Sequence, residues 1–438
     1  MSHYRQDDIL TMQYVMDFQC SGDKCPDNCC HHWQIVVEKD IYQALKKLYQ
    51  GVPGGRKRFQ SGLKKNKEAQ SDRHYSSLKM KPDKNCSFLN PGGLCDIHKR
   101  FGGNRLGWVC KSYPRELTEN FGQTEMALSI SCPEVAKTCL LQEGAFEITK
   151  APRRIIESIE DFHVTLPDNP DNPPYVQLRN EIKEVLFMLA NTSQYPVAAR
   201  LFLMLHFAQQ VSGYFNKKAT SDCTGQLIEE INQIADPDTH QGLVKKFYDR
   251  IPDYTLSTGT PLAILLFRTD NKNSFGQFCG TIFSQYGLEI SCVPESATSK
   301  EFNGLIERFI QSRGILEEHY AQRFEMYLER LLIYRTGSDY YITSPSLLEY
   351  ARNLQVYITI IKFLFILHPE TQEVVNQLSE GREDKAQTEN LDKAIVHVVY
   401  QVSRGFDHWS NRGLELLSRA LDDGQLNEFE QIVTLARS

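Results

Sequence analysis

The stretch LPDNPDNPPY, Leu166–Tyr175, divides the sequence into two parts of different character. It holds four prolines in ten residues. Each proline lacks a backbone donor and restricts the residue before it, so no helix or central strand is expected to cross this stretch. We therefore predict a cysteine-rich region over residues 1–150, a proline-rich linker over residues 151–175 and a helical region over residues 176–438.

The part after the prolines carries apolar residues at three- and four-residue steps, which is the period of an amphipathic helix. The pattern occurs in residues 175–191, 195–215, 224–236, 303–335, 345–368 and 391–408. The most apolar run, VYITIIKFLFILH (residues 356–368), is too short to span a bilayer and predicts a buried core helix. The predicted fold class is mainly α, with a few short strands in the N-terminal third around QIVVEK (residues 34–39).

The composition is ordinary for a soluble globular protein, with 41% hydrophobic and 24% charged residues. The net charge of −6 gives no reason to expect nucleic-acid binding. Residues 1–150 carry 22 Lys and Arg against 17 Asp and Glu, and the remainder carries 27 against 38. The acidic part could attract a cationic substrate, or its charges could be solvated helix faces.

The N-terminal sequence has charges throughout and no apolar core of a signal peptide. We expect a cytoplasmic protein with reduced thiols and no membrane partner. The basic segment GVPGGRKRFQSGLKKNKE, residues 51–68, predicts a mobile surface loop. Binding of nucleic acid or of an acidic partner is the alternative for this segment.

Nine of the twelve cysteines lie within residues 20–139, which in a reducing compartment favours metal or redox chemistry over disulfides. Eight of them are candidate ligands: Cys20, Cys25, Cys29 and Cys30 in one group, Cys86, Cys95 and Cys110 in a second, and Cys132 further on. Zinc and iron–sulfur centres each take four such ligands. Eight thiols therefore allow one centre with spare thiols, or two centres.

Local features support a ligand role for these cysteines. The turn expected at Pro91-Gly92-Gly93 would fold Cys86 back towards Cys95. Adjacent residues point in different directions, so either one of Cys29 and Cys30 binds the main centre or each binds a different one. Nearby histidines are further candidates: His31, His32 and His98. The isolated cysteines are predicted to be small buried hydrophobes: Cys223, Cys279 and Cys292.

These motifs resemble the flagellin lysine-N-methylase family and, more loosely, small zinc- or iron-chelating cysteine-rich domains. The resemblance rests on the paired cysteine in YVMDFQCSGDKCPDNCCHHWQ and on the CSFL, LCDIH and CKSYPR steps. RFEMYLERLLIYR, residues 323–335, resembles a helix in the C-terminal part of the same family. The specific motifs lie in residues 14–135.

The resemblance implies a methyltransferase that moves a methyl group from S-adenosylmethionine to the ε-amine of flagellin lysines. It also implies a [4Fe–4S] cluster, with zinc as the alternative metal, held by four of the eight cysteines. The cofactor site cannot be placed from a G-x-G-x-x-G turn, because none follows a predicted strand. The C-x₃-C-x₂-C spacing of radical S-adenosylmethionine enzymes is also absent, since Cys25, Cys29 and Cys30 give C-x₃-C-C.

Lysine methylation requires a neutral amine, because the protonated form, with a pKa of about 10.4, has no lone pair. A carboxylate or tyrosine could accept the proton. The candidates are Tyr113, Glu116, Glu325 and Tyr327, each of which could instead be an ordinary packed or solvated residue. Arg115 could hold the carboxylate of the cofactor or form a structural ion pair.

A non-enzymatic protein that chelates zinc or iron, or passes electrons through a cluster, is the alternative function. The long helical region favours an enzyme, because a simple chelator would not need it. That region could also be a scaffold that binds flagellin.

Overall fold

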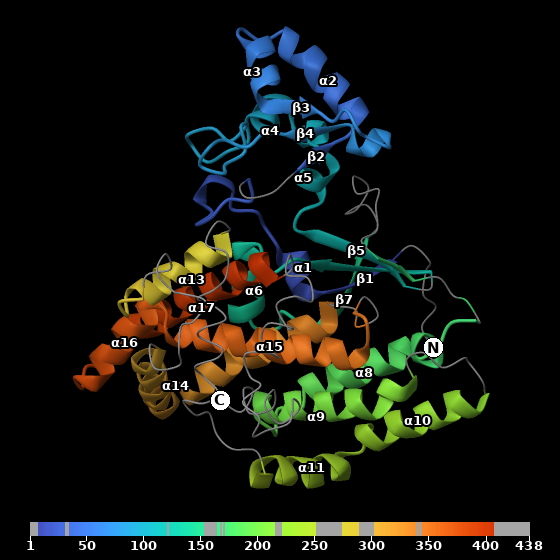
Figure 1. Cartoon of the computed structure of the whole chain (residues 1–438), viewed down its shortest axis with the longest axis vertical. Helices are drawn as coiled ribbons and strands as arrows, with labels where there is room; N and C mark the ends of the chain where they lie inside the picture. The colour runs from blue at the N-terminus through green and yellow to red at the C-terminus, as the bar shows by residue number, and fades with distance from the viewer. Residues whose placement is uncertain are drawn as a thin grey trace. The chain divides into compact units, whose positions relative to one another are not determined.

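The computed structural model describes residues 8–30, 35–120, 122–152, 164–166, 169, 171–214, 221–250, 274–288, 302–338, 341 and 344–406. The chain divides into two compact units (Figure 1). Unit 1 comprises residues 1–138 and 147–167, and unit 2 comprises residues 139–146 and 168–438. The proline-rich stretch thus begins where unit 1 ends, and the predicted boundaries at residues 150 and 175 remain predictions.

Unit 1 contains a five-stranded sheet in the order β7-β1-β6-β5-β8. Its strands are β1 (Asp8–Met12), β5 (Arg115–Asn120), β6 (Gln123–Leu128), β7 (Ile148–Pro152) and β8 (Val164–Leu166). β5 and β6 pair antiparallel with Leu117 opposite Met126, whereas β1 runs parallel to β6. Leu117 and Met126 are buried with Ile9 and Ala151 in one small core. β7 overlaps the start of the predicted linker, and β8 lies within it.

Unit 1 also contains a three-stranded sheet in the order β2-β4-β3. Its strands are β2 (Val36–Val37), β3 (Leu63–Lys65) and β4 (Ser76–Leu78). β2 lies in the QIVVEK segment, as predicted. The helices of unit 1 are α1 (Gln13–Asp17), α2 (Lys39–Gln50), α3 (Gly55–Gly62), α4 (Asp96–Phe101), α5 (Trp108–Ser112) and α6 (Pro133–Leu141), the last of which ends in unit 2.

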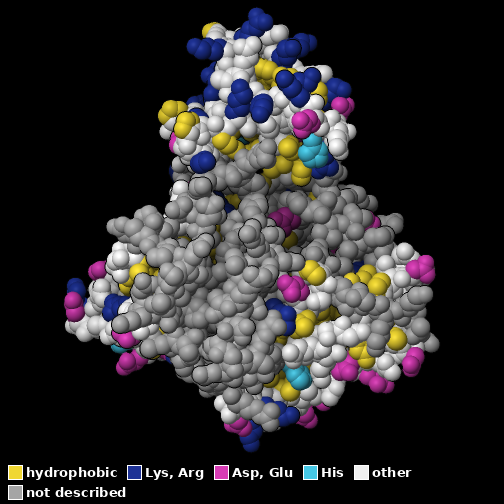
Figure 2. Space-filling model, viewed as in Figure 1, with side chains coloured by type: hydrophobic (Ala, Val, Ile, Leu, Met, Phe, Trp, Pro, Cys, Tyr) yellow, Lys and Arg dark blue, Asp and Glu magenta, His cyan; other side chains and the backbone are white. Residues whose placement is uncertain are grey.

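The prediction of a mobile loop at residues 51–68 is wrong, because this segment forms α3 and β3. The reason is the spacing of its two large apolar residues. Phe59 and Leu63 are four residues apart and both are buried, with the Phe59 ring 5.0 Å from that of Tyr42. Gly62 lies so close to Phe88 that an added Cβ would overlap the Phe88 ring. The lysines and arginines instead cover the outside, and Figure 2 shows such side chains gathered over the part of unit 1 that holds α2 and α3.

The described residues of unit 2 form helices joined by turns and contain no strand. Its helices are α7 (Pro174–Gln177), α8 (Arg179–Ala190), α9 (Val197–Val211), α10 (Ser221–Ala235), α11 (Pro237–Arg250), α13 (Ser274–Ser284), α14 (Asn303–Ser338), α15 (Leu347–Ile366), α16 (Pro369–Ser379) and α17 (Lys385–Phe406). Each of the six predicted segments corresponds to helix, and Pro196 is the residue directly before α9. The mainly α fold with short strands in the N-terminal region is therefore confirmed.

α15 is the central helix of unit 2 and packs against α9, α14 and α17. It is buried almost along its whole length, as predicted for VYITIIKFLFILH. Ser346 begins it as an N-cap, because its hydroxyl accepts from the Glu349 N–H at 3.0 Å. α14 bends at Tyr320, whose φ of −132° and ψ of 23° are not helical.

Within the described residues, no single helix has both the length and the apolar composition to cross a bilayer. In the part of the chain that the structure describes, α15 and α16 meet that test only as a pair, and they are bent by 56° from each other. Of the three isolated cysteines, Cys279 is buried as predicted, Cys223 is only half-buried, and Cys292 lies outside the described residues.

Candidate metal centre and catalytic residues

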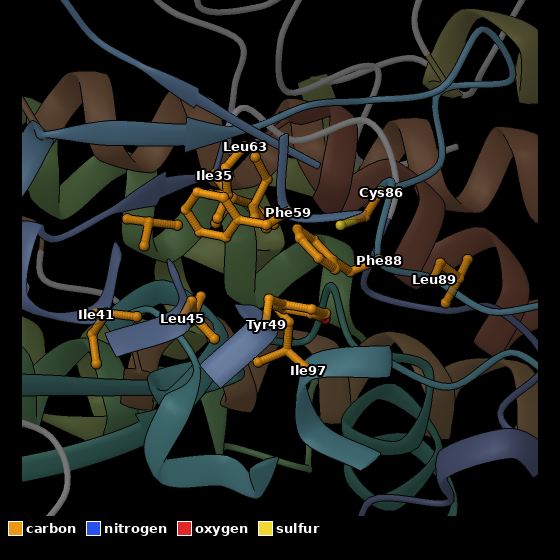
Figure 3. Packing of buried hydrophobic residues seen from close by; sticks show 12 residues of the cluster. Ile35, Ile41, Leu45, Tyr49, Phe59, Leu63, Cys86, Phe88, Leu89 and Ile97 are labelled. Carbon is orange, nitrogen blue, oxygen red and sulfur yellow. The ribbon is translucent and has the colours of Figure 1, made fainter. Parts of the chain in front are cut away.

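Four of the predicted ligands gather at one hydrophobic cluster in unit 1, which α2, α3 and the three-stranded sheet form (Figure 3). Cys86 is buried in this cluster beside Phe88. Three half-buried cysteines pack against it, and with Cys86 they make up the first thiol set: Cys30, Cys86, Cys95 and Cys110. The Cys86 N–H donates to the Cys30 carbonyl at 2.6 Å, which joins two segments that are far apart in the sequence.

A tight turn positions Cys95 within the first thiol set. The Asn90 N–H donates to the Leu94 carbonyl at 2.9 Å, and the Asn90 side chain accepts from the Gly92 N–H at 2.9 Å. Leu89 consequently pairs with Cys95 in an antiparallel bridge. The turn predicted from Pro91-Gly92-Gly93 is present, and it brings the chain after Cys86 back alongside that residue.

Burial raises the pKa of the Cys86, Cys95 and Cys110 thiols. For Cys30, a hydrogen bond between its thiol and that of Cys29 is the larger cause of a raised pKa, and burial is the second. Neighbouring thiols of the set raise these pKa values further, since a second thiolate nearby repels the first. These thiols are therefore neutral on their own, and a bound cation would stabilise the thiolate forms that ligate metals.

The other four predicted ligands do not belong to this cluster, and we call them the second thiol set: Cys20, Cys25, Cys29 and Cys132. Cys132 precedes α6, and its carbonyl accepts from the Ala136 N–H at 2.9 Å. Burial raises the pKa of Cys132 to about 11, and the thiols of Cys25 and Cys29 add to this effect. Burial is also the main cause of the raised pKa of Cys25, to which Glu134 and Cys20 contribute.

Cys29 lies where the two thiol sets meet. Its thiol shares a hydrogen bond with that of Cys30, and its charge would raise the pKa values of both Cys95 and Cys132. Cys29 is exposed, whereas Cys30 is half-buried against the hydrophobic cluster. The adjacent pair thus faces two environments, as expected for neighbouring residues.

The thiols of each set are near one another without forming a closed coordination site. Among the described residues, no three His, Cys, Asp or Glu side chains converge closely enough to hold a metal ion. His98 is exposed on α4, and His31 and His32 lie outside the described residues. The chemistry of the donors fits a soft metal or an iron–sulfur cluster, but the thiols would have to close around it.

Three of the other predicted site residues follow α5 in unit 1. The Tyr113 hydroxyl lies 3.2 Å from the Ser131 hydroxyl, and Arg115 and Glu116 begin β5. The Arg115 guanidinium lies 5.7 Å from the centre of the Phe18 ring. Burial lowers the pKa of Arg115, and the neighbouring Cys20 opposes this shift, so Arg115 lies beside the second thiol set.

Glu325 and Tyr327 lie on α14 in unit 2. Glu325 accepts from the Val197 N–H through a short hydrogen bond, so it caps the start of α9. Burial raises the pKa of Glu325, while the Val197 N–H, Arg200 and Lys362 oppose this shift. A carboxylate with a raised pKa is a stronger base, which suits proton acceptance.

Tyr327 is held in a charged hydrogen-bond network. Its hydroxyl donates to Asp392, and Arg323 donates to that hydroxyl at 2.9 Å. Arg323 also donates to both carboxylate oxygens of Asp392, at 2.7 and 2.6 Å. Burial and Asp392 raise the pKa of Tyr327, so its phenolate form is disfavoured.

A second buried network, which was not predicted from the sequence, is centred on Arg200. This side chain is 1% exposed and pairs with Glu329 at 2.7 Å. It also donates to the carbonyls of Tyr195 and Ala190, at 2.6 and 2.7 Å. Glu329 lies one helical turn after Glu325, so the two carboxylates share one face of α14.

A cavity of about 390 Å³ lies in unit 1 and was also not predicted. Its charged lining residues are Arg58, Lys81, Asp96 and Arg100. Asp96 accepts from Tyr49 at 3.0 Å and from Arg100 at 2.7 Å. Asp96 directly follows Cys95, so the cavity adjoins the first thiol set. In the sequence, the cavity corresponds to the charged run DIHKR after Cys95. This run does not match a recognisable motif.

Comparison with known proteins shows which family this chain belongs to. Residues 183–435 match the FliB lysine N-methylase C-terminal domain, which is more than half of the chain. The chain belongs to the FliB lysine N-methylase family. The resemblance read from the cysteine motifs is therefore confirmed, although the matched domain lies in the helical part of the chain.

Individual relatives of this FliB family member come from Salmonella. A flagellar biosynthetic protein FliU of Salmonella muenchen is 30% identical over 140 residues, which are 31% of this chain and 78% of that protein. A lysine-N-methylase of Salmonella choleraesuis is 28% identical over 142 residues, and that of Salmonella typhimurium is also 28% identical. The match covers only 33% of each lysine-N-methylase. No solved structure gives a significant match.

Proposed function

We propose that this protein is a lysine N-methyltransferase that moves methyl groups from S-adenosylmethionine to the ε-amines of flagellin lysines. The observation that carries the proposal is membership of the FliB lysine N-methylase family. The names of the relatives support the acceptor, since one is a lysine-N-methylase and another is a flagellar biosynthetic protein. The acidic balance of residues 151–438 also suits an acceptor protein that presents lysines.

The reaction transfers a methyl group by attack of the neutral lysine nitrogen on the methyl carbon. A nitrogen–carbon bond forms, the sulfur–carbon bond breaks, and the lysine nitrogen loses one proton. Because lysine is protonated at neutral pH, a base has to accept that proton. Of the four residues predicted for this role, Glu325 fits best, because burial raises its pKa and because it belongs to the matched family domain.

The other predicted bases fit the role less well. The raised pKa of Tyr327 and its hydrogen bond to Asp392 favour a phenol that stays protonated. Tyr113 and Glu116 lie in unit 1, outside the matched domain. Arg115 is a charged donor beside Cys20 and could hold the cofactor carboxylate.

We also propose that the cysteines hold an iron–sulfur cluster of the [4Fe–4S] type, with zinc as the alternative. An iron–sulfur cluster would supply either a fold-stabilising crosslink or an electron-accepting centre. The support is the donor set itself, eight thiols in two neighbouring sets in one unit. Iron, sulfide and zinc counts on anaerobically purified protein test this part of the proposal.

The decisive experiment incubates the anaerobically purified protein with S-adenosylmethionine and flagellin. Mass spectrometry of flagellin is expected to show added mass in steps of one methyl group, located on lysines. Reactions without the cofactor are the control. An unchanged flagellin mass, with folded, metal-loaded protein and fresh cofactor, would overturn the proposal and favour a chelating or redox protein.

A further inference from the structure

We propose that the cavity in unit 1 binds a small phosphate monoester, that is, a phosphate group attached to a compact organic body. The cavity has a volume of about 390 Å³ and lies beside Asp96, at the start of α4. That volume falls within the ordinary range of sites for whole small-molecule ligands. The proposed ligand is separate from the methyl donor, and the inference depends neither on methyl transfer nor on metal binding.

The lining of the cavity is cationic. Three of its side chains are positively charged and one is a carboxylate, which leaves a balance of +2: Arg58, Lys81, Arg100 and Asp96. Like charges gathered around one space repel each other, and a bound anion relieves that repulsion. A phosphate monoester, with a charge of about −1.5 to −2 at pH 7, neutralises this balance. A single carboxylate would neutralise only half of it.

Asp96 positions two of the cations and is itself buried. Its Oδ1 accepts from Arg100 Nε at 2.7 Å, and its Oδ2 accepts from the Tyr49 hydroxyl at 3.0 Å. Arg58 Nε lies 3.8 Å from the same Oδ2. The outer nitrogens of both guanidinium groups make no hydrogen bond to any residue that the structure describes. They are therefore available to a second acceptor, and their fork geometry suits phosphate oxygens.

Further contacts restrain Arg58 and Lys81. The Arg58 guanidinium lies 5.0 Å from the centre of the Phe88 ring, which packs against Tyr49 in the hydrophobic cluster (Figure 3). Lys81 Nζ donates to the Leu89 carbonyl at 3.0 Å, and an ammonium group has two more donors. α3, α4 and the segment between β4 and α4 thus contribute one cation each to the same space.

The rest of the lining suits an organic body. Its apolar members are Val52, Pro53, Leu89 and Pro91. Asn90 lies among them, and its side-chain oxygen accepts from the Gly92 and Leu94 N–H groups at 2.9 and 3.1 Å. Its amide nitrogen is therefore the atom that can donate to a polar group on the ligand. A mainly apolar wall with a few fixed polar groups is the usual composition of a small-molecule site.

The surface around the cavity attracts anions from solution. Residues 35–111 carry 17 Lys and Arg against 6 Asp and Glu. Figure 2 shows such basic side chains gathered over this part of unit 1. A surface of one sign raises the local concentration of ions of the other sign. Dispersed charge marks no site by itself, but the cavity is where three of these cations border one space.

Isothermal titration calorimetry of the full chain, purified without air, tests the proposal. AMP and glycerol 3-phosphate are the monoester probes, adenosine supplies a body alone and inorganic phosphate the anion alone. Both monoesters are expected to bind more tightly than inorganic phosphate, and adenosine not measurably. Added salt should weaken binding, because it screens exposed charges. The proposal would be overturned by an absence of binding with both monoesters, by equal affinities for AMP and adenosine, or by tighter binding of inorganic phosphate than of either monoester.

Two single variants locate the binding site. Arg58→Gln and Lys81→Gln should each weaken AMP binding by about 10- to 100-fold, because each removes a charged donor. Lys57→Gln, the neighbouring position on α3 outside the lining, is the matched control and should keep the original affinity. Circular dichroism checks folding. Lys81→Gln keeps the test decisive should Arg58→Gln misfold, since glutamine can still donate to the Leu89 carbonyl. Unchanged affinity in the folded variants would place binding elsewhere and overturn the proposal.

Competition with the methyl donor separates this site from the proposed activity. S-adenosylmethionine carries a cationic sulfonium and no phosphate, so it should not displace AMP from this cationic cavity. Displacement would make the cavity the methyl-donor site and overturn the proposal. Methyl transfer to flagellin is measured separately, so an absence of AMP binding would leave that activity standing.

Discussion

At the residue scale, Glu325 and Tyr327 are two predicted bases on one helix, and burial raises the pKa of both. The raised pKa makes the Glu325 carboxylate a stronger base, whereas it keeps the Tyr327 phenol protonated. We expect Glu325→Gln to lower the methylation rate by about 10²–10⁴-fold, the usual contribution of a general base. The amide oxygen can still accept from the Val197 N–H, so stability should change little. Tyr327→Phe should instead cost about 1.5–3 kcal/mol of stability, because its hydroxyl bonds to charged groups, and should keep the rate per folded molecule.

Rates on flagellin and urea denaturation of both variants check this pair of expectations. An unchanged rate for Glu325→Gln would remove Glu325 as the base. A rate lost in Tyr327→Phe at full stability would move the role to the tyrosine.

A second residue-scale prediction concerns His368, which burial and the neighbouring His397 keep neutral, with a pKa lowered to about 3. The unfolded chain has a histidine pKa of about 6.5. As the pH falls below that value, the unfolded state takes up the proton first. The stability contributed by His368 is thus complete above pH 6.5 and is lost as the pH falls towards 3, by about 1.4 kcal/mol per pH unit.

Urea denaturation of the protein and of His368→Asn between pH 7 and pH 5 measures this contribution. The asparagine oxygen can accept from the Glu370 N–H as His368 does now, so the cap of α16 is kept. We expect the variant to lose less stability on acidification than the unmodified protein. Equal slopes in the two proteins would contradict the assignment.

At the element scale, Ser346 begins the central helix α15. Ser346→Ala should cost about 1 kcal/mol, because the Glu349 N–H loses its acceptor, whereas Ser346→Asp should be nearly neutral. Denaturation midpoints of the two variants check this. A loss shared equally by both would point to packing rather than capping.

Arg200 joins three helices of unit 2, since it binds carbonyls at the end of α8 and before α9 and pairs with Glu329 on α14. Arg200→Met should destabilise the protein by about 3–5 kcal/mol, because Glu329 and two carbonyls lose their donor. Arg382→Met is the matched control. Its pair with Glu380 is exposed, so its cost should stay within about 0.5 kcal/mol. Chemical denaturation compares the two, and similar costs would contradict a structural role for Arg200.

The long helices of unit 2 could be predicted from the sequence because one apolar period persists over many turns. α15 even shows its cap in the sequence, as Ser346 followed by Glu349. The five-stranded sheet could not be predicted, because β5 and β6 are short and largely polar, and neither shows a regular alternation of apolar and polar residues along its whole length. Their pairing depends on residues distant in the sequence, such as those of β1. α3 and β3 were missed because glycines and lysines surround their two large buried apolar residues, Phe59 and Leu63.

The same limit applies to the candidate site. The sequence identifies the cysteines as a class, since their density within residues 20–139 is unusual. It cannot assign them to sets, because the Cys86 N–H bonds to the Cys30 carbonyl and the Cys132 thiol has Cys25 as a neighbour, and both pairs are far apart in the sequence. Arg200 and Asp96 were missed because a single charged residue in a sequence gives no sign of burial.

At the scale of the whole molecule, the two units differ in what holds them together. Unit 2 buries long helical faces, and α15 is covered by several helices. Around the thiols, unit 1 has helices of at most 12 residues and strands of two or three residues, packed on one cluster of twelve buried residues. So small a core supplies little stability by itself, and structural metal centres commonly make up the difference.

Removing metal should therefore unfold the thiol-bearing part of unit 1 and leave unit 2 folded. After anaerobic chelation of the full chain, hydrogen–deuterium exchange should accelerate in residues 35–110, where α2, α3 and α4 lie. Exchange in residues 347–406, which hold α15 to α17, should stay as slow as before. Adding back zinc, or iron with sulfide, should restore protection in residues 35–110. Equal acceleration in both ranges would mean that the units unfold as one, and no acceleration in either would mean that the thiols are not structural ligands.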